Sequence, residues 1–145
     1  MGNRCVITTR EDFDNDGIGI YLHWNGGRDS VEAFLKYCEL KQYRSVTDDA
    51  SYAYARLCQI IGNFFDGSLG IGIDSVRNLD CDNYDNGTYI IDGWKIVGRE
   101  YFREEMGEQM NYDLLKMLIA IDEKQPEKER IGQDVIKTLL NSEEK

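Results

Sequence analysis

The sequence predicts an α+β fold, with a largely antiparallel sheet, two inserted helices and a C-terminal helical hairpin. Three observations support this prediction. Apolar and more polar residues alternate over short segments such as Ile18–Trp24, which is typical of half-buried strands. Apolar residues recur at spacings of three and four between Ser30 and Phe65, which is typical of amphipathic helices. From Asn111 onward only the helical spacing recurs, and this indicates the hairpin.

The 145 residues are expected to form a single domain over 1–145, because no linker-like or low-complexity stretch divides the sequence. Within it, residues 1–105 would form a strand-rich core with two helices, and residues 111–145 the helical hairpin. No segment approaches the ~20 apolar residues that a membrane-spanning helix requires. The four cysteines lie far apart in apolar or strand-like settings and are expected to be reduced. We therefore expect a cytoplasmic protein with no membrane association.

Two strands and two helices are expected in the first half of the chain. Their bounds are Cys5–Thr8 and Ile18–Trp24 for the strands, and Ser30–Leu40 and 50–65 for the helices. An acidic turn, Glu11–Gly17, is expected to join the two strands. Asp29 or Ser30 is expected to cap the first helix, since Glu32 follows Asp29 at capping-box spacing.

Three short strands are expected in the next part of the chain: Gly67–Asp74, Thr88–Ile91 and Trp94–Val97. In the first of them Leu69, Ile71 and Ile73 would share one face. Asn86-Gly87 is the dipeptide type that most strongly favours a two-residue hairpin turn, and Asp92-Gly93 is a second such turn.

The C-terminal hairpin is expected to contain one helix ending near Gln125 and a second in which Pro126 occupies the first turn. Both helices carry apolar stripes. These stripes predict that the hairpin either covers one face of the sheet or forms an oligomer interface.

The chain carries 17 basic and 27 acidic residues, giving a net charge of −10. This charge opposes binding to a nucleic acid polymer, whose affinity rests on neutralised phosphates. It also suits a protein that imitates nucleic acid, with Glu11–Asp16 and Asp80–Asp85 as its contact points. The single histidine and the scattered cysteines show no metal-ligand spacing and no catalytic set, so we expect no metal, no cofactor and no enzymatic activity.

A candidate ligand site lies where the second strand meets the first helix. Gly26 and Gly27 would leave backbone N–H groups open to an anion at the helix N-terminus, and Arg28 adds a fork of donors. His23 and Trp24 supply planar rings nearby. These parts predict a site for a phosphorylated, base-containing small molecule. The alternatives are a surface Arg28 paired with an acidic neighbour and a Trp24 packed in the core.

The segments Trp24–Glu39, Ala55–Gln59 and Asp82–Tyr89 resemble the first-described family of phage-encoded anti-Thoeris proteins. Members of that family bind cyclic ADP-ribose isomers made by bacterial TIR-domain proteins without cleaving them, and some bind cyclic oligonucleotides at separate sites in a hexamer. The resemblance implies a non-enzymatic sponge for a small cyclic nucleotide, a homo-oligomer, and residence in the cytosol of an infected cell.

The resemblance also implies that arginines and an aromatic ring hold the ligand. In this chain those roles fall on Arg28, Arg56 and Trp24, with Arg99, Arg103 and Asn86 as further candidates. Arg56 lies off the apolar stripe of its helix, so its guanidinium is free to point at solvent or a ligand. The three arginines come from distant parts of the chain, and the sequence does not show whether they converge.

Two other functions remain open from the sequence. One is an acidic protein inhibitor of a nuclease or a CRISPR effector, which the net charge of −10 favours. The other is an enzyme acting on nucleotides, such as a phosphodiesterase.

Overall fold

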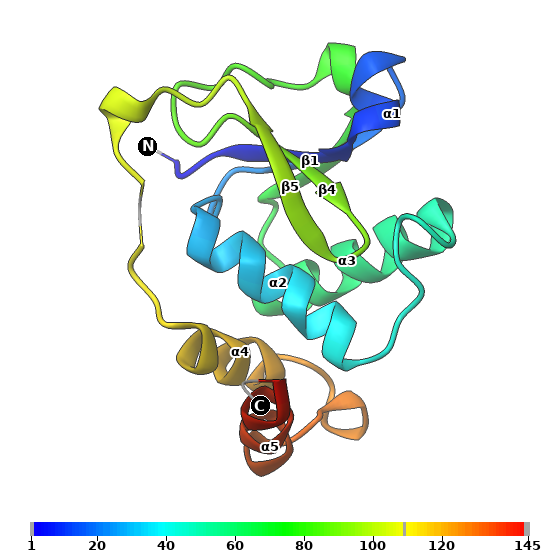
Figure 1. Ribbon diagram of the computed structural model, residues 1–145, viewed down its shortest axis with the longest axis vertical. Helices are drawn as coiled ribbons and strands as arrows, with labels where there is room; N and C mark the ends of the chain where they lie inside the picture. The colour runs from blue at the N-terminus through cyan, green and yellow to red at the C-terminus, as the bar shows by residue number, and fades with distance from the viewer. Residues whose placement is uncertain (1, 109, 144–145) are drawn as a thin grey trace.

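A five-stranded sheet forms the centre of the protein, with the strand order β3-β2-β1-β4-β5 (Figure 1). The computed structural model describes residues 2–108 and 110–143. The strands are β1 (Cys5–Thr9), β2 (Ile18–Leu22), β3 (Ile71–Ser75), β4 (Thr88–Asp92) and β5 (Lys95–Glu100). The predicted α+β fold with a largely antiparallel sheet is confirmed.

The central strand β1 is antiparallel to β2 and parallel to β4. Ile7 pairs with Ile20 on one side and with Tyr89 on the other. The remaining pairs, β2 with β3 and β4 with β5, are antiparallel. The first four residues of β1 are all buried, as expected for a strand with neighbours on both edges and cover on both faces.

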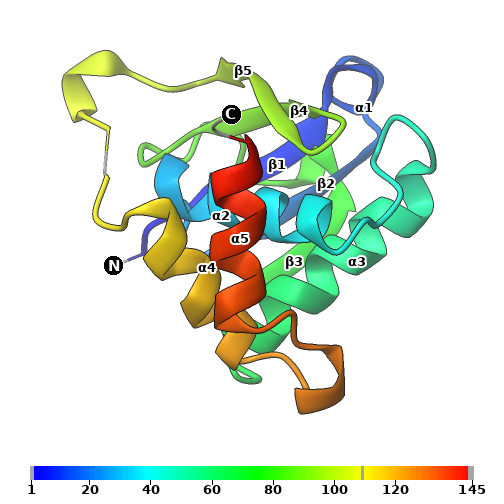
Figure 2. The same cartoon turned by 60° about the horizontal axis from the view of Figure 1, so that its bottom comes forward.

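The helices are α1 (Arg10–Asp14), α2 (Arg28–Leu40), α3 (Ala50–Phe64), α4 (Leu114–Glu123) and α5 (Gln133–Glu143). The helices α2, α3, α4 and α5 lie in two layers on one side of the sheet, which Figure 1 shows in profile, whereas α1 lies at the end of β1 and contacts β1, β2 and β4. Three single 3-10 turns complete the chain: η1 (Val76–Asn78), η2 (Glu104–Met106) and η3 (Glu127–Glu129). The helices α2 and α3 cover the sheet, α4 packs on α2, and Figure 2 shows α5 beside α4.

The core fills the space between the sheet and the first helix layer. The predicted apolar stripe of α2 is confirmed, since Val31, Phe34, Leu35 and Cys38 are all buried. The stripe of α3 is likewise buried at Ala53, Leu57, Ile60 and Ile61, while Phe64 is half-buried. The hairpin of α4 and α5 lies outside this layer, so the alternative in which it covers a face of the sheet is wrong. The other alternative, an oligomer interface, stays a prediction.

Two predicted element starts are also wrong. Residues 11–14 of the expected acidic turn lie in α1, because the Thr9 side chain accepts a hydrogen bond from the Asp12 backbone N–H and caps a helical turn. The helix α2 begins at Arg28, and its N-cap is Gly27 rather than Asp29 or Ser30. The Asp29 carboxylate instead accepts hydrogen bonds from the backbone N–H groups of Ser30 and Tyr112.

Three further predictions fail for local reasons. Asn86-Gly87 is not a hairpin turn: it leads into β4, and the polar segment before it is not a strand. Leu69 lies before β3 and is fully exposed. Pro126 precedes the short turn η3, and α5 begins only at Gln133. The predicted hairpin between β4 and β5 is present, but its two turn residues are Gly93 and Trp94 rather than Asp92 and Gly93, because Asp92 pairs with Lys95 in the sheet.

Candidate functional site: a cationic cavity at Arg56

The Gly26 N–H before α2 is not open to an anion, contrary to the prediction. The Gly26 N–H donates to the Asn3 carbonyl at 2.8 Å, and a Cβ at Gly26 would lie 2.5 Å from that oxygen, so glycine is required there by close backbone packing. The Arg28 guanidinium pairs with Glu32 at 2.7 Å. The buried Asp29 carboxylate supplies the negative charge that the helix end favours.

Arg99 and Asn86 lie together beside this helix end, around the buried ring of Tyr89. The Tyr89 hydroxyl donates to the Gly26 carbonyl at 2.7 Å and accepts from Arg99 at 3.1 Å. Arg99 also donates to the Asn86 carbonyl at 3.0 Å, and its guanidinium lies 4.1 Å from the Tyr89 ring centre. Both carboxylate oxygens of Glu108 accept from it, at 3.0 and 3.1 Å. Gly26, Asn86 and Arg99 therefore converge, but in a site whose donors are already used.

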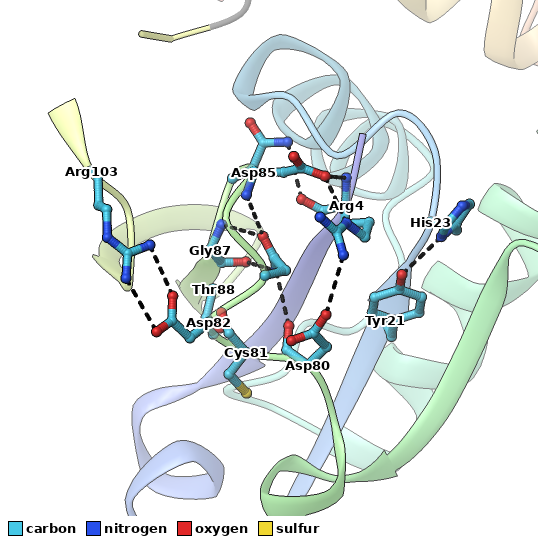
Figure 3. A network of polar contacts seen from close by, with 12 residues as sticks. Arg4, Tyr21, His23, Asp80, Cys81, Asp82, Asp85, Gly87, Thr88 and Arg103 are labelled. Carbon is cyan, nitrogen blue, oxygen red and sulfur yellow. Dashed lines mark hydrogen bonds and ion pairs between the residues drawn. The ribbon is translucent and has the colours of Figure 1, made fainter. Parts of the chain in front are cut away.

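Arg103, which follows β5, belongs to a different network with residues of the loop that precedes β4 (Figure 3). It pairs with Asp82 at 3.0 Å and lies 4.5 Å from the Tyr84 ring centre. Figure 3 also shows Arg4 pointing at Asp80 and Asp85, at 3.5 and 2.8 Å. The carboxylates of this loop are thus largely neutralised by arginine.

His23 and Trp24 form a small aromatic patch on the surface. The His23 Nδ1 is 2.9 Å from the Tyr21 hydroxyl (Figure 3), and the His23 and Trp24 rings meet edge to face with centres 4.7 Å apart. Trp24 is 45% exposed, so the alternative of a core tryptophan is wrong.

Arg56 is the candidate whose surroundings differ from all of these. In residues 2–108 and 110–143, its Nε is the one buried side-chain nitrogen or oxygen that has no hydrogen-bond partner. It also forms no ion pair with any described carboxylate, whereas Arg28, Arg99 and Arg103 each do. A buried donor without an acceptor costs about 1–3 kcal/mol, so this atom calls for an explanation.

Arg56 lines a cavity of about 200 Å³ between the end of α2, the middle of α3 and the turn after α4. Aromatic, amide and charged groups surround it. The lining residues are Tyr37, Lys41, Tyr43, Arg56, Gln59, Ile60, Asn63, Gln125, Pro126 and Glu129.

Cations and tyrosine rings cluster at the α2–α3 side of this cavity, where Lys41, Tyr43 and Arg56 belong to the lining and Arg44 and Tyr52 lie next to them. The guanidinium carbons of Arg56 and Arg44 lie 5.1 and 4.4 Å from the centre of the Tyr52 ring. The Lys41 ammonium lies 6.0 Å from the centre of the Tyr43 ring, and the Tyr43 and Tyr52 rings meet edge to face. Such a cluster stands out in a chain with a net charge of −10.

Amide side chains and a short turn form the opposite side. The Asn63 amide donates to Gln125 at 2.8 Å, and Gln125 donates to the Ile60 and Ile121 carbonyls, both at 3.1 Å. The Lys41 ammonium donates to the Glu129 backbone carbonyl and lies 3.8 Å from the Glu129 carboxylate. The bonds to Asn63, Ile60 and Ile121 fix the orientation of the Gln125 amide.

Charges from both sides act on Tyr43. Burial raises the pKa of its hydroxyl; the nearby Glu129 carboxylate raises it further, and the Arg56 guanidinium opposes the increase. The described lining contains no serine, cysteine or histidine, and therefore none of the usual nucleophile–base pairs. These groups can bind an anion at Arg56, a ring against tyrosine and hydrogen-bonding groups at the amides.

The arginines that the resemblance pairs do not share one pocket. Arg28 begins α2 and Lys41 follows its last residue, so the 13-residue helix separates Arg28 from the cavity by about 20 Å. Sequence reasoning missed Lys41, Tyr43 and Tyr52 altogether. The two basic residues and the tyrosine within Lys41–Arg44 were the available signal.

No group of three or more histidine, cysteine, aspartate or glutamate side chains in the described ranges is placed to hold a metal ion. Nor does any helix in those ranges have the length and apolarity to cross a bilayer. Comparisons with protein-family models, curated proteins and solved structures find no match for this chain.

Proposed function

We propose that this protein is a non-enzymatic binder that sequesters a small cyclic nucleotide, with the phosphate held by Arg56. One observation carries the proposal: the buried Arg56 Nε has no acceptor and borders a cavity. A ligand phosphate would supply that acceptor, and guanidinium is the side chain best suited to a phosphate.

The remaining groups of the cavity fit the other parts of a nucleotide. Tyr43 offers a ring for a base, and the amides of Gln59 and Asn63 offer hydrogen bonds to its edge. At about 200 Å³ the cavity is smaller than the ~300–1,000 Å³ of most ligand sites. It would hold one nucleotide unit, and a second subunit would cover the rest of a larger cyclic ligand. This agrees with the sponge, the homo-oligomer and the infected-cell cytosol implied by the resemblance.

The first experiment is titration calorimetry with cyclic ADP-ribose isomers and a panel of cyclic dinucleotides. After titration each sample is heated and the released ligand is weighed by mass spectrometry. We expect binding and intact release. A ligand that is consumed with time would indicate an enzyme, and the absence of heat with every nucleotide would overturn the proposal.

Variants of Arg56 then locate the site. Arg56→Lys keeps the charge but loses the fork of donors, and we expect about tenfold weaker binding. Arg56→Met should abolish measurable binding while leaving the free energy of unfolding unchanged or higher, because the unpaired donor is removed. Arg28→Ala is the matched control, and unchanged affinity is expected since Glu32 already pairs with it.

The acidic inhibitor stays as a second candidate because of one feature. Asp16 comes together with Asp80 and Asp82 around an open hollow of about 480 Å³, so parts of the two acidic segments do share a surface. Arginines neutralise Asp80 and Asp82, which weakens the imitation of a nucleic acid. Binding to a nuclease that is lost in high salt, together with indifference to nucleotides, would favour this candidate.

A further inference from the structure

The charge in the Arg56 cavity is not purely positive, because Glu129 contributes a carboxylate. Arg56 and Lys41 supply two positive charges, and Glu129 supplies one negative charge among the lining residues. No other ionisable carboxylate or ammonium belongs to the described lining. The cavity therefore carries a formal charge of about +1 before a ligand enters.

Two anchors and the contact with Lys41 fix Glu129 at the cavity rim. Before the turn, the buried Gln125 side chain is bound to the Ile60 and Ile121 carbonyls. After it, the Asp122 carboxylate accepts from the Ile131 and Gly132 N–H groups at 2.7 and 2.9 Å. The Lys41 ammonium then holds the Glu129 carbonyl itself. These contacts fix the backbone of Glu129 at the rim, and its half-exposed carboxylate lies 3.8 Å from the Lys41 ammonium.

Phosphate groups of different chemistry meet this charge differently. A phosphodiester, such as the one in a cyclic nucleotide, carries a single negative charge. A terminal phosphomonoester carries about −1.5 to −2 near neutral pH because its second pKa is about 6. The first matches the charge of the cavity, whereas the second places excess negative charge against Glu129.

We infer that Glu129 is a specificity-determining residue that makes the Arg56 cavity select singly charged phosphodiesters over terminal phosphomonoesters. The inference rests on the proposed function, since it takes the ligand phosphate to lie at Arg56. It explains the preference for a cyclic ligand by the charge of the cavity, and it gives the Glu129 carboxylate a role in ligand selection.

The test compares 3′,5′-cyclic AMP with 5′-AMP by titration calorimetry at pH 8 and low salt. The wild-type chain should bind the cyclic nucleotide more tightly. In Glu129→Gln we expect the affinity for AMP to rise about fivefold and that for cyclic AMP about twofold, an effect typical of one half-exposed charge pair. The quantity to compare is the ratio of the two affinities in the variant against the same ratio in the wild type, because the difference in shape between the two probes affects both ratios equally.

Glu127→Gln is the matched control, with the same charge change at an exposed position in the same 3-10 turn. It should leave the ratio unchanged. Equal shifts for both probes in Glu129→Gln, or the same shift in Glu127→Gln, would overturn the inference on Glu129. If the wild-type chain binds neither cyclic AMP nor AMP and no larger cyclic nucleotide, the proposed function fails with it. Binding that depends on Arg56 but ignores Glu129 leaves the function and removes only the selectivity.

Circular dichroism and the unfolding midpoint of each variant establish that it is folded. Raising the salt concentration gives a second readout. The advantage of Glu129→Gln for AMP should shrink as salt screens the half-exposed carboxylate, whereas a change in cavity shape would persist.

Discussion

The buried carboxylate of Asp122 joins the outer helix layer to the inner one. It accepts hydrogen bonds from the Tyr37 hydroxyl on α2 at 2.6 Å and from the Ile131 and Gly132 N–H groups before α5. Burial raises the pKa of the Tyr37 hydroxyl, and the bond to Asp122 raises it further, so the hydroxyl remains a donor. One side chain therefore fixes both the position of the hairpin and one side of the Arg56 cavity.

Replacing this carboxylate should be costly. In Asp122→Ala three buried or half-buried donors lose their acceptor, and we expect the free energy of unfolding to fall by about 3 kcal/mol. Urea unfolding measures the change. Glu123→Ala, at the exposed next position of α4, should stay within about 0.5 kcal/mol of wild type. A loss below about 1 kcal/mol in Asp122→Ala would show that the hairpin is held by its apolar contacts instead.

Single residues also show where sequence reasoning on the site stops. Arg56 was correctly placed off the apolar stripe of its helix, since that follows from spacing within one element. The missing acceptor at its Nε depends on three segments that are far apart in the sequence. The partners of Arg28 and Arg103 illustrate the same limit: Glu32 is a local neighbour that the sequence suggests, whereas Asp82 is not.

At the scale of elements, the start of β4 depends on the backbone conformation of Gly87. Its φ of +69° lies in the left-handed region, and a Cβ there would be 2.4 Å from the Glu100 carbonyl oxygen. The Asn83 side chain bonds both the N–H and the carbonyl of Gly87, at 3.0 Å each. Asn86-Gly87 thus serves a loop that enters a strand, which explains why the hairpin expectation failed although the dipeptide itself was correctly marked as a turn former.

We expect Gly87→Ala to destabilise the fold by about 2–3 kcal/mol, from left-handed strain plus a backbone clash. Gly93 provides the control, because it has a φ of +61° but no atom within 4 Å of an added Cβ. Gly93→Ala should therefore cost only about 1 kcal/mol of strain. Thermal unfolding of the two variants separates the cost of backbone strain from the cost of the clash. Equal losses of stability in Gly87→Ala and Gly93→Ala would contradict the proposed clash at Gly87.

Helices and strands differ in how much of them the sequence predicts. The stripes of α2 and α3 were predicted closely because helical periodicity is a local property. The pairing of β1 with β4 was not, since it joins segments about 80 residues apart and depends on what the intervening chain buries. The spacing of apolar residues along the sequence does not determine the strand order. It therefore does not determine where the loops lie at the sheet edges.

At the scale of the whole molecule, buried hydroxyl and thiol groups make stability sensitive to alkaline pH. Burial raises the pKa of Tyr54 from 10.0 to about 12, and that of Cys58 from 9.0 to about 11. The pKa values of Tyr37 and Tyr89 are also raised by burial. Because the folded state holds these protons more tightly, the stabilisation is complete below the unfolded pKa values and is lost as pH rises through the folded ones.

We therefore expect the free energy of unfolding to fall progressively between pH 9 and about 12. Urea unfolding under reducing conditions at a series of pH values measures it. Tyr54→Phe should be less stable at pH 8, since it loses the bond to Asp12 at 2.8 Å, yet its decline above pH 10 should be shallower. Tyr112→Phe, at an exposed position, should follow the wild-type curve, and a flat wild-type curve would contradict the assignment.

The parallel contact between β1 and β4 also bears on how the chain is made. β1 is synthesised about 80 residues before β4, so the partner on its second edge is complete only when synthesis reaches Asp92. Until then an apolar strand at the centre of the future sheet has one open edge, and open strand edges invite pairing with other chains. The nascent protein is therefore most exposed to aggregation while α2 and α3 are already present and β4 is not, so the speed of synthesis through residues 64–92 bears directly on its yield.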